Sequence, residues 1–194
     1  MKSLDNLKKR LRPGQVYRRA DLEKWSKSVD RDLAKLVENG TLAKVSRGLY
    51  AFPKMSRFGE LPPQPEKLVK AFLKDDDFLL TSPNDYNSLG LGTTQLYNVQ
   101  IVYNHKRHGR FELEGQVFDF KMKARFPKKA TAEFLLVELV NNLKNLAEDH
   151  EKLLQRVRVK APQMNTRRLA TAVKKFAKVS TRKVFEEALS CDSR

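Results

Sequence analysis

Residues 16–53 read VYRRADLEKWSKSVDRDLAKLVENGTLAKVSRGLYAFP, and this stretch decides the fold of the first part of the chain. Its hydrophobic spacing predicts a short helix at 20–25, a second helix that ends at Asn39-Gly40, and then a two-stranded hairpin. An amphipathic helix over residues 4–11 precedes them. Two helices followed by a hairpin are typical of a winged helix-turn-helix. In that fold one helix enters a DNA groove while the hairpin, called the wing, lies against the backbone.

The second helix has one apolar face and one cationic face. Its buried stripe is predicted to consist of Val29, Leu33, Leu36 and Val37. The opposite face carries Lys27, Arg31 and Lys35, four residues apart. Ser28 is the expected N-cap, because its hydroxyl can accept a hydrogen bond from an otherwise unpaired amide. A row of cations on a short, capped helix suits groove docking, although a solvated charged face is the alternative reading.

The wing is predicted from strands at 42–45 and 49–52, joined by residues 46–48, whose glycine can take a positive φ. Arg47 stands at the tip of this hairpin, and Lys44 lies beside it. An arginine at a hairpin tip can enter a narrow minor groove or clamp a phosphate. The wing therefore favours DNA binding over a merely solvated surface.

These elements together define a predicted DNA-contact surface. The residues expected to approach base edges or adjacent phosphates are Lys27, Ser28 and Arg31. The residues expected to hold the DNA backbone are Arg18, Arg19, Lys35, Lys44 and Arg47. With roughly six phosphates neutralised, the logarithm of affinity should fall against the logarithm of salt concentration with a slope of about −5.

The charge distribution favours the same class of partner. The chain of 194 residues has a formal net charge of +16. Residues 1–53 carry a surplus of seven positive charges and residues 150–194 a surplus of eight, whereas residues 54–149 are nearly neutral. Cationic ends of this kind favour a long polyanion, with DNA or RNA ahead of an anionic membrane surface. A soluble protein that is merely basic is the alternative.

The basic helices near the end of the chain add a second cationic region. Its cations are Arg167, Arg168, Lys174, Lys175, Lys178, Arg182 and Lys183. An amphipathic helix pair with such an outer face could extend a DNA footprint, touch RNA or meet an acidic protein. A plain solvated surface is the other reading of the same pattern.

The overall fold class predicted is α+β: the winged helix-turn-helix of residues 1–53, a linker or edge connection at 54–65, and a domain at 66–194. The linker is expected because 54–65 contains three prolines within four positions. The last domain is predicted as a small antiparallel sheet packed with helices, followed by a helical C-terminal part. Its expected strands are 78–80, 99–103, 110–113 and 117–122, and its expected helices are 66–73, 83–90, 131–147, 150–159, 166–178 and 181–189.

Motifs for catalysis or metal binding are scarce. His105 and His108 flank two cations on a predicted hairpin tip, where positive charge repels a metal ion. The three aspartates at 75–77 are better explained by a solvated turn than by a magnesium site. No phosphate-binding, dinucleotide-binding or nucleophile-elbow motif occurs, and the single Cys191 reads as an incidental thiol. We therefore expect no enzymatic activity, no cofactor and no metal ion.

The sequence also bears on localisation. The segment MKSLDNLKKR lacks the apolar core of a signal peptide. The most apolar run, residues 130–140, is interrupted by Glu133 and Glu138 and is too short to span a bilayer. We expect a soluble, cytoplasmic protein that does not bind membranes. A single cysteine is consistent with a reducing compartment.

Four motifs occur in the order in which they occur in a known family. They are LVENGTLAKVSRGLYAFP at 36–53, GELPP at 59–63, SPNDYNSLGLGTTQ at 82–95 and VQIVYN at 99–104. With these motifs the chain resembles the AbiEi family of antitoxins from type IV toxin–antitoxin, or abortive infection, systems. The resemblance covers about residues 10–125 and leaves out the helical part from 131 onward.

The resemblance implies a DNA-binding antitoxin that represses its own operon by docking a winged helix on inverted repeats in the promoter. The partners implied are double-stranded DNA and a nucleotidyltransferase-like toxin, which the antitoxin opposes without a stable complex; we expect a monomer in solution. Residues 66–194 would form the antitoxin-type domain. Only Arg47, Gly48 and Tyr50 of the wing transfer directly from the family motif.

Two other functional classes are compatible with the sequence. One is a stand-alone winged-helix transcriptional regulator whose C-terminal domain senses a ligand or a partner. The other is an enzyme that acts on nucleic acid and uses the winged helix for targeting. The lack of an acidic cluster suited to a metal ion argues against the enzyme.

Overall fold

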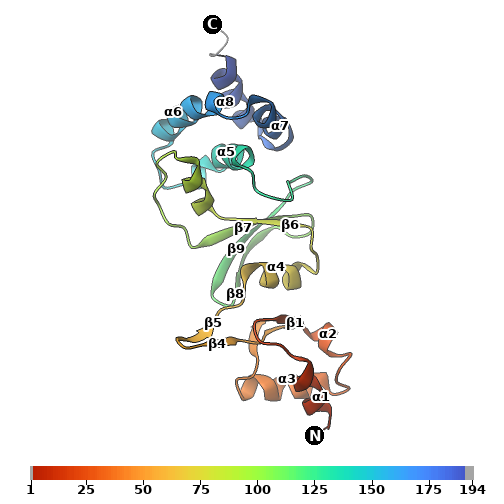
Figure 1. The fold of residues 1–194 in the computed structure, drawn as a ribbon. Helices are drawn as coiled ribbons and strands as arrows, with labels where there is room; N and C mark the ends of the chain where they lie inside the picture. Colours follow the sequence, from red (N-terminus) through yellow and green to blue (C-terminus); the bar gives the residue numbers. More distant parts are fainter. Residues whose placement is uncertain (1, 191–194) are drawn as a thin grey trace. The chain divides into compact units, whose positions relative to one another are not determined.

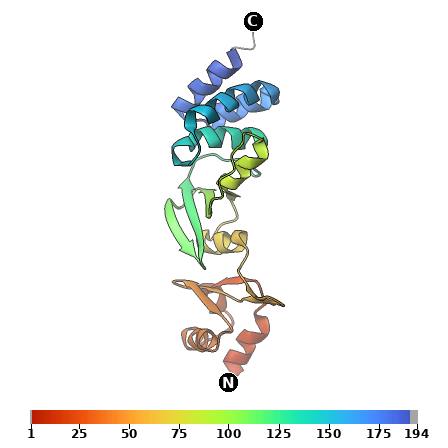
Figure 2. The same ribbon diagram turned by 90° about the vertical axis from the view of Figure 1, so that its left-hand side faces the viewer.

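Helices and small antiparallel sheets make up the α+β fold of this protein, which a computed structural model describes for residues 2–190 (Figures 1 and 2). The α+β class predicted from the sequence is confirmed. The chain folds into two compact units. The first unit runs to Asp76 and includes Arg110–Phe118, and the second contains Asp77–Gly109 and the chain from Asp119 onward. Cys191 lies outside the described residues.

The first unit opens with three helices and a three-stranded sheet. In chain order these elements are α1 (Lys2–Arg10), β1 (Val16–Arg18), α2 (Arg19–Leu22), α3 (Val29–Glu38), β2 (Ala43–Ser46) and β3 (Leu49–Ala51). The strand order in the sheet is β1-β3-β2, with both neighbouring pairs antiparallel. The predicted helices and hairpin are all present, although α2 is shorter than the six residues expected.

Apolar side chains from each of these helices meet in one core. Its fully buried members are Leu7, Leu22, Leu33, Leu36 and Leu42. Tyr50 and Phe52, which alternate along the hairpin, pack against this core as their period-two spacing predicts. The helical face and the hairpin face are therefore joined by hydrophobic burial.

Ser28 does not cap α3, so the capping prediction was wrong. Its side chain accepts no hydrogen bond from the helix amides, and its hydroxyl instead lies 3.4 Å from the carboxylate of Asp32. Asp32 is only 3% exposed and also accepts hydrogen bonds from Ser26 (2.7 Å) and Ser3 (2.9 Å). Burial raises the pKa of Asp32, but hydrogen bonds from the three hydroxyl groups and the charge of Arg31 together lower it. Burying a carboxylate without hydrogen-bond donors costs more free energy than leaving the first amides of a helix without a side-chain acceptor.

A second hairpin occupies the start of the segment where the sequence predicts a linker or edge connection. Strands β4 (Lys54–Ser56) and β5 (Gly59–Leu61) pair antiparallel. The tip is exposed, with Phe58 85% accessible and the guanidinium of Arg57 lying 4.7 Å from the centre of its ring. Each strand has only three residues, too few for the alternation to stand out beside three prolines.

Helix α4 (Pro65–Leu73) follows this hairpin and belongs to the same unit. Pro65 occupies its first turn, where the missing amide proton costs no hydrogen bond. The ammonium group of Lys67 donates to the carbonyl of Gly14 at 2.9 Å, which ties α4 to the loop before β1. The first unit thus includes a helix that the sequence assigned to the following domain.

The four-stranded sheet contains β6 (Phe78–Thr81), β7 (Val99–Asn104), β8 (Gly109–Leu113) and β9 (Gln116–Met122). Each strand agrees with its prediction to within two residues at either end. The order is β6-β7-β9-β8, so β9 lies beside β7 and the sheet does not follow chain order. β6 and β7 pair antiparallel with Phe78 opposite Asn104. The hairpin turn between β8 and β9 falls within the residues grouped with the first unit.

A 3-10 helix, η1 (Pro83–Leu89), follows β6 where a helix is predicted. Ser82 accepts from the amide of Asn84, and Asp85 accepts from the amide of Ser82, which together form a capping box. The side chain of Asn84 then exchanges two hydrogen bonds with the backbone of Tyr97, at 2.8 and 2.9 Å. The SPND motif is therefore a structural device that anchors a long loop.

The rest of the second unit is helical. Its elements are α5 (Ala132–Asn141), η2 (Leu143–Asn145), α6 (His150–Lys160), η3 (Ala161–Gln163), α7 (Thr166–Phe176) and α8 (Val179–Ser190). α5 is buried from Phe134 to Asn141, and it lies between strands β6 and β7 and helices α6 to α8 (Figures 1 and 2). Burial on all sides, with Glu138 and Asn141 as the polar exceptions among apolar side chains, is typical of such a central position.

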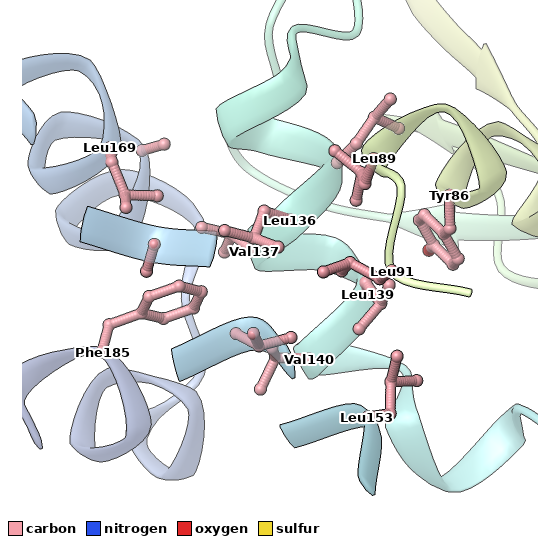
Figure 3. Packing of buried hydrophobic residues seen from close by; sticks show 14 of the residues in the cluster. Tyr86, Leu89, Leu91, Leu136, Val137, Leu139, Val140, Leu153, Leu169 and Phe185 are labelled. Atoms are coloured by element: carbon pink, nitrogen blue, oxygen red, sulfur yellow. The ribbon is translucent and has the colours of Figure 1, made fainter. Parts of the chain in front are cut away.

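The core of this helical part is shown in Figure 3. Its labelled residues are Tyr86, Leu89, Leu91, Leu136, Val137, Leu139, Val140, Leu153, Leu169 and Phe185. They come from the loop around η1, from α5 and from helices α6, α7 and α8. The apolar surface of each of these elements is therefore removed from solvent only when all of them are assembled. Within residues 2–190, none of the helices combines the length and the apolar character that a membrane crossing requires.

Candidate nucleic-acid interface

The exposed face of α3 carries the cations that the sequence places there. Arg31 and Lys35 are both exposed on the helix, and Lys27 is exposed in the turn before it. None of the three forms an ion pair with another of the described residues. An exposed positive charge that has no ion-pair partner on a short helix is available to an external anion.

The β2–β3 hairpin presents two further cations. Lys44 on β2 and Arg47 in the turn are exposed, and neither has an acidic partner in the described part of the chain. Gly48 takes a φ of +73°, which lets the chain reverse between Ser46 and Leu49, the last residues of the two strands that lie opposite each other. The left-handed glycine therefore holds Arg47 at the tip, as the sequence predicts.

Arg19 connects the hairpin turn to the first turn of α3. Its backbone amide donates to the carbonyl of Gly48 at 2.8 Å. Its guanidinium donates twice to the carboxylate of Asp30, at 2.6 and 2.7 Å. Arg31 and Arg47 are each the chain neighbour of a residue that Arg19 contacts. Arg19 thus links the two segments that carry the predicted contacts, through its backbone amide on one side and its guanidinium on the other.

Arg18 and Arg19 are themselves engaged in ion pairs. Arg18 donates to Asp21 through two nitrogens, at 2.7 and 2.8 Å, and Arg19 contacts Glu23 at 3.2 Å as well as Asp30. The hydrogen bond from Arg18 lowers the pKa of Asp21, and the bond from Arg19 lowers that of Asp30. A phosphate would have to compete with these carboxylates for either arginine.

The eight predicted contact residues therefore fall into three groups. Arg18 and Arg19 are paired, and Ser28 is half-buried with its hydroxyl facing Asp32. The five exposed cations without an ion pair in the described chain are Lys27, Arg31, Lys35, Lys44 and Arg47. Asp21 and Asp30 are the residues that the prediction overlooked. The Arg18–Asp21 spacing of three signals its pair in sequence, whereas Arg19 and Asp30 are eleven residues apart.

The second unit contains a buried cluster of polar side chains around Glu138, a kind of group that can serve in catalysis. Glu138 is 2% exposed and accepts hydrogen bonds from Lys123 (2.7 Å), Asn141 (2.7 Å), Asn142 (3.2 Å) and the hydroxyl of Tyr103. Burial raises the pKa of Tyr103, and the nearby Glu138 charge raises it further.

Both oxygens of the Glu138 carboxylate are occupied by donors within the fold, so the cluster holds α5 to the sheet rather than facing a substrate. The sequence shows Glu138 only as an interruption in an apolar run, and its partners include residues from other segments. Among the described residues, no group of three or more His, Cys, Asp or Glu side chains is arranged to hold a metal ion.

His105 has local partners instead. Its ring nitrogen lies 3.3 Å from the carboxylate of Asp77, and its ring stacks on Phe126 with centroids 4.7 Å apart. His108 is exposed in the same loop.

Comparison with known proteins places residues 4–169 in the protein family DUF6088, described as a family of unknown function. No curated protein and no solved structure matches the chain.

Proposed function

The chain belongs to DUF6088, a family of unknown function, and we propose that it binds double-stranded DNA through its first unit, which acts as a winged helix-turn-helix. The order of elements supports this proposal, because α1, β1, α2, α3, β2 and β3 succeed one another as the helices and strands of that fold do. The pairing order β1-β3-β2 supports it as well, because it leaves the β2–β3 turn free to serve as the wing.

A single observation carries the proposal: α3 with the turn before it and the β2–β3 hairpin together expose five cations that have no ion pair in the described chain. A single exposed lysine or arginine has little effect on the free energy of folding. Several like charges without ion pairs in one unit repel one another, and a bound anion lowers that electrostatic free energy. Arg19 bonds to both segments, so the cations of the helix and those of the hairpin are connected through one residue. A duplex supplies phosphates and base edges to both.

The roles within this surface follow from position. Arg31, in the first turn of α3, is assigned to base edges or the phosphates next to them, together with Lys27. Lys35, Lys44 and Arg47 are assigned to the backbone, with Arg47 also able to enter a narrow minor groove. Arg18 and Arg19 hold the scaffold through Asp21 and Asp30 and reach phosphate only if those pairs open.

We further propose that the protein is an antitoxin and transcriptional autorepressor of a type IV toxin–antitoxin operon. The support is the ordered series of AbiEi-like motifs, including the RGLY turn at 47–50 and the SPND segment at 82–85. On this proposal the first unit binds inverted repeats in its own promoter. The rest of the chain opposes a nucleotidyltransferase-like toxin in the cytoplasm without a stable complex.

The alternative is a stand-alone regulator whose second unit senses a ligand. One observation favours it: the second unit contains a large cationic groove that the repressor role does not use. A neighbouring toxin gene whose growth arrest is relieved by co-expression of this protein supports the antitoxin. Loss of promoter binding on addition of a small molecule, without any such gene, supports the regulator.

The first test is a titration of the protein onto labelled DNA from upstream of its own gene. We expect Arg31→Ala and Arg47→Ala each to weaken binding by about 1–3 kcal/mol where the residue reads a base. Lys8→Ala is the matched control, because it removes one exposed charge from α1, outside the proposed surface. Unchanged affinity in both arginine variants, or an equal loss in the control, would refute the docking face.

A further inference from the structure

A groove of about 920 Å³ lies in the second unit, between the segment after β9 and helix α7. Its lining comes from residues 124–128, from Thr131 and Glu133 at the start of α5, from α7 between residues 167 and 176, and from Asp77 and His105. This volume is at the upper end of the range that ligand sites occupy. None of these residues belongs to the proposed duplex surface, which lies in the first unit.

Five cations line this groove: Arg125, Lys128, Arg167, Arg168 and Lys175. All five are exposed, and none has an ion pair within the described chain. Asp77 and Glu133 are the acidic residues of the lining, and Asp77 is already paired with His105. The groove therefore has an excess of positive charge that residues of the fold do not neutralise.

Two of these cations lie at the positive end of a helix dipole. Arg167 and Arg168 lie in the first turn of α7, where the helix dipole is positive and favours acidic side chains. Asn165 caps the helix by accepting from the amide of Arg168 at 3.0 Å, but it brings no charge. Two arginines at this end add to the dipole instead of offsetting it. An anion bound between them relieves both.

Two aromatic rings belong to the apolar part of the groove lining. Phe126 and Phe176 are half-buried, and each is held by a second ring. Phe126 stacks on His105 at 4.7 Å, and Phe176 meets Phe134 edge-on at 5.2 Å. These contacts fix the two rings in place, so a flat heterocycle that lies on them loses little conformational freedom of the protein.

Cations around fixed aromatic rings suit a ligand that carries both phosphates and a base. We propose that this groove binds nucleotides, with its arginines and lysines on the phosphates and Phe126 or Phe176 against the base. The source is either a single-stranded stretch of RNA or a free nucleoside triphosphate. An acidic peptide matches the charge of the groove but has no base to lay on the rings.

The experiment uses the full-length protein and two probes: a fluorescent single-stranded RNA octamer of mixed sequence, and ATP in a calorimeter. For the octamer we expect a salt slope of about −3.5 if all five cations contact phosphate, because each contact to a single strand contributes about −0.7. The double variant Arg167→Gln/Arg168→Gln should make that slope shallower by about 1.4 and weaken binding on the order of ten-fold or more.

The matched control is Lys174→Gln/Lys183→Gln, which removes the same charge from exposed positions outside the groove. We expect it to leave affinity and slope nearly unchanged. Phe126→Leu tests the base contact: it should weaken octamer binding several-fold while leaving the salt slope unchanged. Thermal unfolding of each variant shows whether it folds. If Phe126→Leu does not fold, the double variant Arg167→Gln/Arg168→Gln still tests the proposal, because both arginines are exposed.

Binding of the octamer identifies a strand as the ligand, and binding of ATP alone identifies a free nucleotide. Failure of both probes, equal losses in the control, or tighter binding of poly-glutamate than of the octamer would overturn the proposal. Binding at the groove and duplex binding by the first unit can be tested separately. Arg31→Ala and Arg47→Ala should leave octamer binding intact, and the groove variants should leave promoter binding intact.

Discussion

The salt dependence of duplex binding can be worked out from the ion pairs of the first unit. Seven cations are candidates for phosphate contact, but Arg18 and Arg19 are held by Asp21 and Asp30. Each phosphate neutralised on B-DNA contributes about −0.9 to the slope of log affinity against log salt. Five free cations therefore give a slope of about −4.5, whereas all seven would give about −6.3. The value of about −5 expected from the sequence lies between the two.

Two substitutions test which cations count. Arg47→Gln should make the slope shallower by about 0.9, because one phosphate contact is lost. Asp30→Asn should make it steeper by as much as about 0.9 and tighten binding, because it frees Arg19 from its stronger partner and removes a repelling charge. Glu23 remains near Arg19 at 3.2 Å, so the gain is expected to be partial.

Fluorescence polarisation of promoter DNA at salt concentrations from about 50 to 200 mM measures these slopes. Lys8→Gln serves as the control and should reproduce the parent slope. A parent slope flatter than about −2 would contradict the assignment of five contacts. Weaker binding by Asp30→Asn would show that the Arg19–Asp30 pair is needed to shape the surface. It would also show that Arg19 does not contact a phosphate when it is released from Asp30.

Three further predictions concern the scaffold. Glu138→Ala should destabilise the fold by about 3–5 kcal/mol in urea unfolding, because it leaves Lys123 and the buried hydroxyl of Tyr103 without their acceptor; a loss below about 1 kcal/mol would contradict this. Because the pKa of Asp32 is lowered in the folded state, its contribution is present above the ordinary value of 3.8 and is lost as pH falls through the lowered pKa. The stability difference between the parent and Asp32→Asn should therefore shrink in that acid range, and a difference independent of pH would refute the assignment. Gly92→Ala should cost about 1–2 kcal/mol in thermal unfolding, because φ is +68° and the new methyl meets Arg156, which bonds to Leu91; Gly115→Ala, with an equally left-handed φ but open space, isolates the backbone part.

Local chemistry is what made much of the fold predictable. The stripe from Val29 to Leu36 indicates α3 because hydrophobic spacing near 3.6 residues leaves one face to bury. Gly48 indicates the hairpin turn, and Ser82-Pro83 indicates the start of η1, since each acts on the backbone within a few residues of itself. Elements specified in this way appear where they are expected, with small shifts at their ends.

Pairings between distant residues were decided by tertiary structure. Ser3, 29 residues away, helps to bury Asp32 among three serines, and Asp32 then takes the hydroxyl of Ser28 that was assigned to the helix cap. The Arg19–Asp30 pair removes an expected phosphate contact. Glu138 finds donors on β7 and beyond the end of β9, as well as on its own helix.

By itself, then, the sequence determined the helices, the hairpin with Arg47 at its tip and the cationic face of α3, because spacing and turn chemistry act between near neighbours. Tertiary structure decided which cations stay unpaired, that β9 lies beside β7, and that residues 124–128 face α7 across a groove. Those outcomes depend on which buried polar groups find partners and which apolar faces meet. Both are settled only when segments far apart in the chain come together and exclude water.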